Sequence, residues 1–172
     1  MDINNNGFQT NVWGPMAWIF LHMVTLNYKP ERKSDIYKFF KSLKGVLPCG
    51  ACRNNFNKII NGTNPKLRLT MDKLRTRQTL SYWLFLVHNE VQRGIYLRTN
   101  KVSDRPVYKD TKEDYKKAMN KLETMRAQCH KNSYGCTIPT KGTRKRAEIH
   151  IMPRQNCPRK RKDPLVIHKK CV

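Results

Sequence analysis

The chain has 172 residues, with 35 Lys and Arg against 12 Asp and Glu, and a formal net charge of +23 at pH 7. This length suits one domain with a tail and excludes a pair of full domains. The positive charge will attract polyanions such as nucleic acid or anionic lipid, but it is no evidence of sequence-specific recognition.

The start of the chain predicts no export. Residues 1–6 lack the basic start and the apolar stretch of a secretory signal. The most apolar segment, residues 13–26, is interrupted by Gly14, Pro15 and His22 and falls short of the ~20 residues that cross a bilayer. We expect no membrane span, and in such a chain six cysteines indicate redox or metal chemistry rather than a disulfide framework.

Apolar residues at helical spacing predict the first three helices. The first opens at Gly14-Pro15, and the second covers residues 34–47, where Pro48 ends it. The third begins at a cysteine pair and ends at Asn61-Gly62.

A polar loop at residues 63–70 follows, and then a long amphipathic stretch from residue 71 to about 96. Residues 111–114 resemble a capping box that starts a last helix. Since no convincing strand pair precedes Cys129, we predict an all-α fold.

From Cys129 onward the helical pattern gives way to Pro, Lys and Arg. This segment carries twelve basic residues against Glu148 and Asp163, so it repels itself, and we predict that it is disordered. The expected domains are a helical bundle at residues 7–128 and a basic, cysteine-containing tail at 129–172. The tail would be an electrostatic tether or would bind polyanions without specificity, since it has no zinc finger and no recognition helix.

Cys49 and Cys52 stand in the run LPCGACR at the first turn of the third helix. Two thiols three residues apart can close a small disulfide, and the positive end of a helix stabilises a thiolate. Three uses stay open: a thioredoxin-type redox centre, half of a zinc site completed by Cys129, His130 or Cys136, or a dithiol that passes electrons to another cofactor. A thioredoxin fold needs a central sheet, which the predicted helices disfavour.

Two further motifs accompany the cysteine pair: WGPMAWIFLH at residues 13–22 and WLFLVHNEVQ at 83–92. In this order and spacing the three motifs resemble the FAD-linked sulfhydryl oxidases of the Erv/ALR family, most of all the forms carried by large cytoplasmic DNA viruses. The resemblance covers roughly residues 8–108. It implies a four-helix bundle that binds FAD and is followed by a short fifth helix. Such proteins often form a head-to-tail homodimer.

The resemblance also implies a set of site residues. Cys49 and Cys52 would be catalytic, and no residue would bind a metal. The implied cofactor-binding residues are Trp13, Gly14, Trp18, His22, Tyr28, Trp83, His88, Asn89, Val91 and Gln92. The tryptophans alone could be core residues, but His22 and His88 on the same helix faces need polar partners that an apolar core does not supply.

The function that the resemblance implies is a FAD-dependent thiol oxidase. Electrons would pass from substrate thiols through Cys49 and Cys52 to FAD and on to O2, which gives H2O2. The partners would be thiol-containing proteins, and the location the host cytoplasm and the virion. The alternative is a zinc-stabilised, basic helical protein that binds nucleic acid.

The chain departs from the family at several places. Gln92 stands where the family has a second Asn, and no cysteine between Arg53 and Gln128 could form the family's extra structural disulfide. The segment Arg105-Pro106-Val107-Tyr108 resembles the family's basic-Pro-aromatic segment after a longer spacer, which leaves Lys101 and Tyr108 as candidate FAD contacts. Candidate shuttle pairs, or else idle thiols, are Cys129 with Cys136 and Cys157 with Cys171.

Overall fold

The computed structural model describes residues 7–99, 109–129 and 135–145. The chain divides into two units, Met1–Lys116 and Lys117–Val172. The boundary lies inside the fifth helix, so the domain limits expected from the sequence, 7–128 and 129–172, stay a prediction. Within the described ranges, none of the helices has both the length and the apolar character that a bilayer crossing requires.

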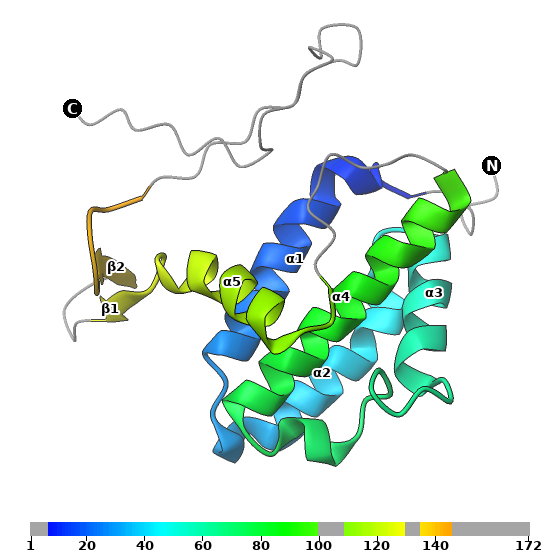
Figure 1. Cartoon of the computed structure of the whole chain (residues 1–172), viewed down its shortest axis with the longest axis horizontal. Helices are drawn as coiled ribbons and strands as arrows, with labels where there is room; N and C mark the ends of the chain where they lie inside the picture. Colours follow the sequence, from blue (N-terminus) through cyan, green and yellow to red (C-terminus); the bar gives the residue numbers. More distant parts are fainter. Residues whose placement is uncertain (1–6, 100–108, 130–134, 146–172) are drawn as a thin grey trace, which may run out of the picture. The chain divides into compact units, whose positions relative to one another are not determined.

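The first unit is a bundle of four helices, which confirms the predicted all-α class (Figure 1). The helices are α1 (Thr10–Leu26), α2 (Lys33–Val46), α3 (Gly50–Asn61) and α4 (Arg77–Thr99), and α5 (Lys112–Glu123) follows them. Two short 3-10 turns, η1 (Pro30–Arg32) and η2 (Met71–Leu74), lead into α2 and toward α4.

Helix α4 is the central element, because both α1 and α3 pack against it. It runs antiparallel to α1 (Figure 1), and at one end Arg77 donates to the carbonyl of Leu26 at 3.5 Å. In the core, the Phe40 ring lies edge-on to Trp83 with centroids 5.2 Å apart. Among the described residues, the largest fully buried side chains are Trp83, Phe40, Ile60, Leu74, Leu80, Leu84, Val87, Thr25 and Ser81.

Helix α1 begins one turn earlier than the sequence predicted. We expected Pro15 at its first position, but the helix starts at Thr10 and Pro15 lies inside it. The backbone N–H groups of Val12 and Trp13 both donate to the Gln9 carbonyl, at 3.0 and 3.3 Å. These bonds form the extra turn, so Pro15 is the sixth residue of the helix and lacks the N–H that would otherwise donate to the Asn11 carbonyl.

The amphipathic stretch predicted from residue 71 to about 96 is two elements. The turn η2 ends at Leu74, and α4 starts at Arg77. At the start of α4, the N–H of Thr79 donates to Thr76 Oγ1 at 3.1 Å and the N–H of Thr76 donates to Thr79 Oγ1 at 3.0 Å. This reciprocal capping starts a new helix, and apolar periodicity alone does not reveal it.

Helix α5 starts where the capping box predicted. Thr111 Oγ1 accepts from the N–H of Asp114 at 3.1 Å. Within the first unit, Tyr115 joins this helix start to α4, since its hydroxyl lies 2.5 Å from Ser81 Oγ and its ring packs edge-on against Phe85.

The second unit contains a hairpin that the sequence did not predict. Strand β1 (Ala127–Cys129) pairs antiparallel with β2 (Cys136–Pro139), and the Cys129–Cys136 disulfide joins opposite positions. Strands of three and four residues are too short to show an alternating pattern. Residues 130–134 and 146–172 of the predicted disordered tail, including Cys157 and Cys171, and the segment with Lys101 and Tyr108 lie outside the described residues.

Candidate functional site

The predicted cysteine pair is a disulfide at the start of α3. Cys49 and Cys52 are bonded to each other, and both are half-buried. Cys49 is the N-cap of the helix, with an extended backbone, and its sulfur accepts from the N–H of Cys52 at 3.2 Å. When the pair is reduced, that N–H and the positive end of the helix favour a thiolate on Cys49.

The segment ahead of α1 lies against the disulfide. The N–H of Phe8 donates to the Pro48 carbonyl at 2.9 Å. A Cβ on Gly7 would lie 2.6 Å from that carbonyl oxygen and 3.1 Å from Cys49 Cα. A side chain does not fit at this position, so the absence of a Cβ is what lets the segment approach the cysteine. Gly7 was not predicted from the sequence, because a single glycine gives no signal of such an approach.

Trp13 connects this segment to α1. Its indole Nε1 donates to the carbonyl of Phe8 at 3.1 Å. The starts of α1 and α3 therefore lie at the same end of the bundle. Because α4 is antiparallel to α1, the C-terminal half of α4 reaches that end too (Figure 1).

Four of the predicted cofactor residues form one cluster between α1 and α4. The rings of Trp18 and His88 stack with centroids 4.0 Å apart and planes 9° apart. His22 Nε2 lies 3.1 Å from His88 Nδ1, and His88 Nε2 lies 3.3 Å from Nε2 of Gln92. We call these residues, Trp18, His22, His88 and Gln92, the imidazole cluster.

His22 carries a buried nitrogen that the described protein leaves unsatisfied. The residue is 6% exposed, and burial lowers its pKa to about 4, so the ring is neutral at pH 7. Its Nδ1 has no hydrogen-bond partner among the described residues. Such a group costs about 1–3 kcal/mol when left unsatisfied, so His22 Nδ1 is a candidate contact for a bound ligand.

Gly14 leaves room on the same face of α1. It precedes Trp18 by one helical turn, and a Cβ built on it meets no atom within 4 Å. Open space beside an aromatic ring and an unsatisfied imidazole fits a flat, polar heterocycle such as the flavin nucleotide. The 4.0 Å separation of Trp18 and His88 leaves no room for a ring between them, so a planar ligand would use other faces of the cluster.

Tyr28 and Trp83 lie in the core of the bundle. Tyr28 is 4% exposed and donates from its hydroxyl to the Leu74 carbonyl at 2.7 Å. Trp83 is 1% exposed and donates from Nε1 to the Leu67 carbonyl at 2.8 Å. Both polar groups are bound to backbone of the bundle, and the predicted contact of these residues with the cofactor stays a prediction.

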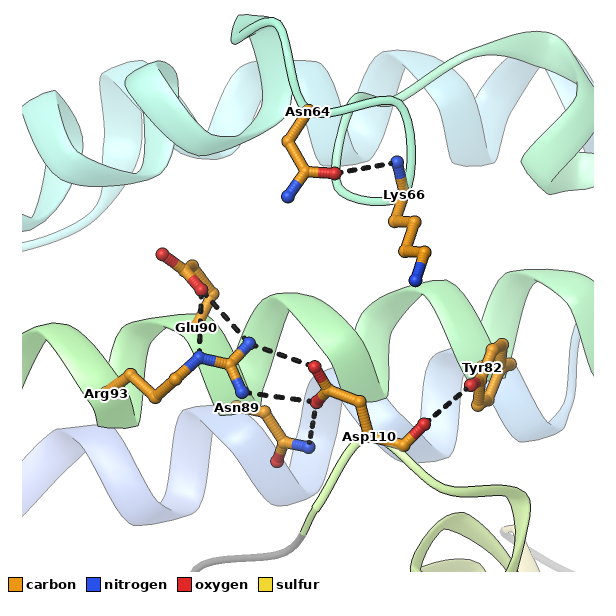
Figure 2. Close-up of polar contacts among 7 residues, drawn as sticks. All are labelled: Asn64, Lys66, Tyr82, Asn89, Glu90, Arg93 and Asp110. Atoms are coloured by element: carbon orange, nitrogen blue, oxygen red, sulfur yellow. Dashed lines mark hydrogen bonds and ion pairs between the residues drawn. The ribbon is translucent and has the colours of Figure 1, made fainter.

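Asn89 belongs to a second polar cluster, centred on Asp110, which was not predicted from the sequence (Figure 2). Its Nδ2 donates to Oδ1 of Asp110 at 2.9 Å, while Val91 lies half-buried on the same helix. Arg93 donates two hydrogen bonds to the same carboxylate, one to each oxygen, at 3.3 and 3.2 Å. It also forms an ion pair with Glu90 at 3.0 Å. We call Asn89, Arg93 and Asp110 the Asp110 clamp.

The Asp110 clamp fixes the entry to α5 on α4. Tyr82 adds a hydrogen bond from its hydroxyl to the Asp110 carbonyl at 3.0 Å (Figure 2). Burial alone would raise the pKa of Asp110, but the hydrogen bonds from Asn89 and Arg93, with the charges of Arg93 and Lys66, hold it below its ordinary value. The only sequence signal was its place one residue ahead of the predicted capping box at Thr111.

The zinc alternative would use Cys129, His130 or Cys136. Cys129 and Cys136 are bonded to each other, and a disulfide sulfur is not the thiolate that zinc binds. His130 lies outside the described residues. Among those that are described, no group of three or more His, Cys, Asp or Glu is arranged to hold a metal ion.

Comparisons with known proteins agree with the motifs. The sequence pattern that defines the Erv1/Alr family matches residues 15–115, a range that contains the disulfide and the imidazole cluster. The chain is 40% identical over 83 residues to a probable FAD-linked sulfhydryl oxidase of Acanthamoeba polyphaga mimivirus. That match covers 46% of this chain and 55% of the viral protein, so the chain spans about half the length of this curated relative. Because the family pattern matches more than half of the chain, the chain belongs to the Erv1/Alr family.

Proposed function

We propose that the protein is a FAD-dependent thiol oxidase that forms disulfide bonds in partner proteins. The observations that support this most are the Cys49–Cys52 disulfide at the start of α3 and the imidazole cluster on α1 and α4, with its buried Nδ1 of His22 that the described part of the chain leaves unsatisfied. The disulfide lies at the end of the bundle where α1 and α3 begin and α4 ends. The mimivirus relative, described as a probable FAD-linked sulfhydryl oxidase, supports the same activity.

The imidazole cluster and Gly14 would hold the cofactor. The rings of Trp18 and His88 offer flat faces, Nδ1 of His22 offers a polar contact, and Gly14 offers room for a ring. When bound, FAD supplies the chemistry that the side chains lack, accepting two electrons from the dithiol and delivering them to O2 as H2O2.

The chain's own part in the reaction is thiol–disulfide exchange. A substrate thiolate attacks the sulfur of Cys49, which breaks the Cys49–Cys52 bond and releases a thiolate on Cys52. The second substrate thiolate then attacks the mixed disulfide. The substrate leaves with its own disulfide, and both cysteines are left reduced. The N–H of Cys52, 3.2 Å from Cys49 Sγ, stabilises the charge on Cys49 in this last step.

The partners and the location belong to the same proposal. The substrates are thiol-containing proteins, the electron acceptor is molecular oxygen, and the enzyme forms a homodimer. The basic tail binds polyanions through salt-sensitive contacts. A viral relative supports a place in the host cytoplasm and the virion. If virion proteins keep their disulfides after the gene is silenced, this location and role are wrong.

The competing function is a zinc-stabilised protein that coats nucleic acid, which the net charge of +23 favours. One experiment separates the two. The purified full-length protein is examined by visible absorption, by metal analysis and by oxygen uptake with dithiothreitol. The oxidase will be yellow, free of zinc, and will consume oxygen and release peroxide. A colourless, folded protein with stoichiometric zinc would overturn the proposal.

A further inference from the structure

The imidazole cluster contains a chain of hydrogen bonds from Gln92 through His88 to His22. Gln92, at the outer end, can decide which atom donates in each of these bonds. Gln92 lies one turn after His88 on α4, and its Nε2 is 3.3 Å from His88 Nε2. The other ring nitrogen, His88 Nδ1, lies 3.1 Å from His22 Nε2 on α1. One side chain on the half-buried part of α4 is thus connected through two rings to the buried Nδ1 of His22.

The atoms that face one another in these two contacts assign the protons. An amide nitrogen only donates, so His88 Nε2 accepts from Gln92. A neutral His88 then carries its proton on Nδ1 and donates it to His22 Nε2. His22 must therefore carry its own proton on Nδ1. This nitrogen has no hydrogen-bond partner among the described residues. In this tautomer it is an N–H donor without an acceptor there.

We propose that Gln92 is a positioning residue that holds His22 in its Nδ1–H tautomer through His88, so that the buried N–H donates to an acceptor atom of the bound flavin nucleotide. The inference rests on the proposed function for the identity of the ligand. It adds a role for Gln92, which stands where the family has a shorter amide, and it names the kind of ligand atom that His22 recognises: a carbonyl oxygen or an unprotonated ring nitrogen.

Length is what gives Gln92 this role. Residues four apart on a helix are neighbours, and the glutamine amide reaches the far ring nitrogen of His88. A carboxylate in the same place only accepts, so His88 would carry its proton on Nε2 and donate it to the carboxylate in a hydrogen bond. His88 Nδ1 would then accept from His22, and His22 Nδ1 would become a lone pair. Gln92→Glu should therefore reverse the whole chain.

The first test reads the tautomers directly. Nitrogen-15 NMR of the histidine rings is recorded on the full-length protein with its flavin bound, at an alkaline pH where the same spectrum shows both rings to be neutral. In the wild type, His22 should show a protonated Nδ1 and an unprotonated Nε2. In Gln92→Glu the assignment should invert. Gln78→Glu is the matched control, because it places the same charge on the exposed start of α4, and it should keep the wild-type pattern.

The second test reads the contact with the flavin in a neutral variant. Gln92→Met removes the donor but preserves length and charge, so the tautomer of His22 is no longer fixed. The apparent dissociation constant rises as the competent fraction falls, and we expect flavin binding about twofold to tenfold weaker. His22 Nδ1 of the wild type should also shift in the NMR spectrum when flavin is added to the cofactor-free protein.

The outcomes separate the two proposals. A protein that binds no flavin overturns the proposed function, while the tautomers of the cofactor-free protein still test the chain. If His22 keeps a protonated Nδ1 in Gln92→Glu with neutral rings, Gln92 does not set the tautomer. If the tautomer inverts but Gln92→Met binds flavin as tightly as the wild type, His22 does not donate to the cofactor.

Discussion

Trp18 and His88, seventy residues apart in the sequence, lie ring against ring with centroids 4.0 Å apart and planes 9° apart. The stack joins α1 to α4 at the level where the imidazole chain crosses between them. Aromatic pairs of this kind contribute about 0.5–1.5 kcal/mol beyond the area that they bury. The cluster is therefore a fixed part of the bundle, and its polar atoms are held in place before any ligand binds.

The burial of His22 predicts a loss of stability in acid. Its pKa is about 4 in the folded chain and 6.5 in its ordinary state. Between these values the unfolded chain binds a proton that the folded chain does not, so the free energy of unfolding falls as the pH falls from about 6.5 to about 4, by up to about 3 kcal/mol. Urea unfolding followed at several pH values across this window measures the effect.

The control for this prediction is His22→Leu, which replaces the titrating imidazole with an apolar side chain of similar size. The variant should lose this part of the pH dependence, while the carboxylates titrate as before. An identical slope in the two proteins would show that His22 is protonated in the folded state.

Gly14→Ala should change stability and flavin binding in opposite directions. Nothing lies within 4 Å of the added Cβ, so replacing a glycine inside a helix should stabilise the flavin-free protein by about 0.5–1 kcal/mol. If the flavin occupies this space, the methyl group should weaken its binding by at least about fivefold, since overpacking costs about 1–3 kcal/mol. Thermal unfolding and flavin fluorescence measure the two effects.

Gly45→Ala is the matched variant on α2, where the Cβ also meets nothing within 4 Å. It should give the same gain in stability and leave flavin binding unchanged. Equal flavin affinity in Gly14→Ala and the wild type would place the cofactor elsewhere.

The Asp110 clamp should contribute measurably to stability. Asp110→Ala removes the acceptor of Asn89 and the two hydrogen bonds that Arg93 donates to Asp110. We expect a loss of about 1–2 kcal/mol at neutral pH. Because the folded-state pKa of this carboxyl lies below its ordinary value, the difference from the wild type should persist above the ordinary value and shrink as the pH falls through the folded one.

Asp72→Ala provides the comparison for the clamp. Its contact with Arg75 is 4.0 Å long and both side chains are largely exposed, so this change should cost less than about 0.5 kcal/mol. Denaturant unfolding of both variants decides the matter, and equal losses would mean that the Asp110 clamp is no stronger than an exposed ion pair.

The sequence predicted the parts of the site that depend on local spacing. Pro48 followed by Cys49 placed the cysteine pair at a helix start, and it is there. The motifs at residues 13–22 and 83–92 placed Trp18, His22 and His88 on helices, and the bundle brings them together.

The features that the sequence did not predict depend on contacts between distant segments. Asp110 binds Arg93, seventeen residues earlier in the sequence. Gly7 lies against Cys49, although two helices separate these residues in the sequence. Neither residue belongs to a periodic pattern. The hairpin at Cys129 was missed for a different reason, because its strands are short and a disulfide joins them.

The most direct test of the central claim is an anaerobic titration of the flavin-loaded protein with dithiothreitol, followed by visible absorption. The wild type and Cys129→Ser/Cys136→Ser, which removes only the other described disulfide, should both lose the flavin absorption as electrons pass through Cys49 and Cys52. Cys52→Ser should stay yellow and lose turnover down to the uncatalysed rate. Flavin in Cys52→Ser that is reduced as fast as in the wild type would contradict the account.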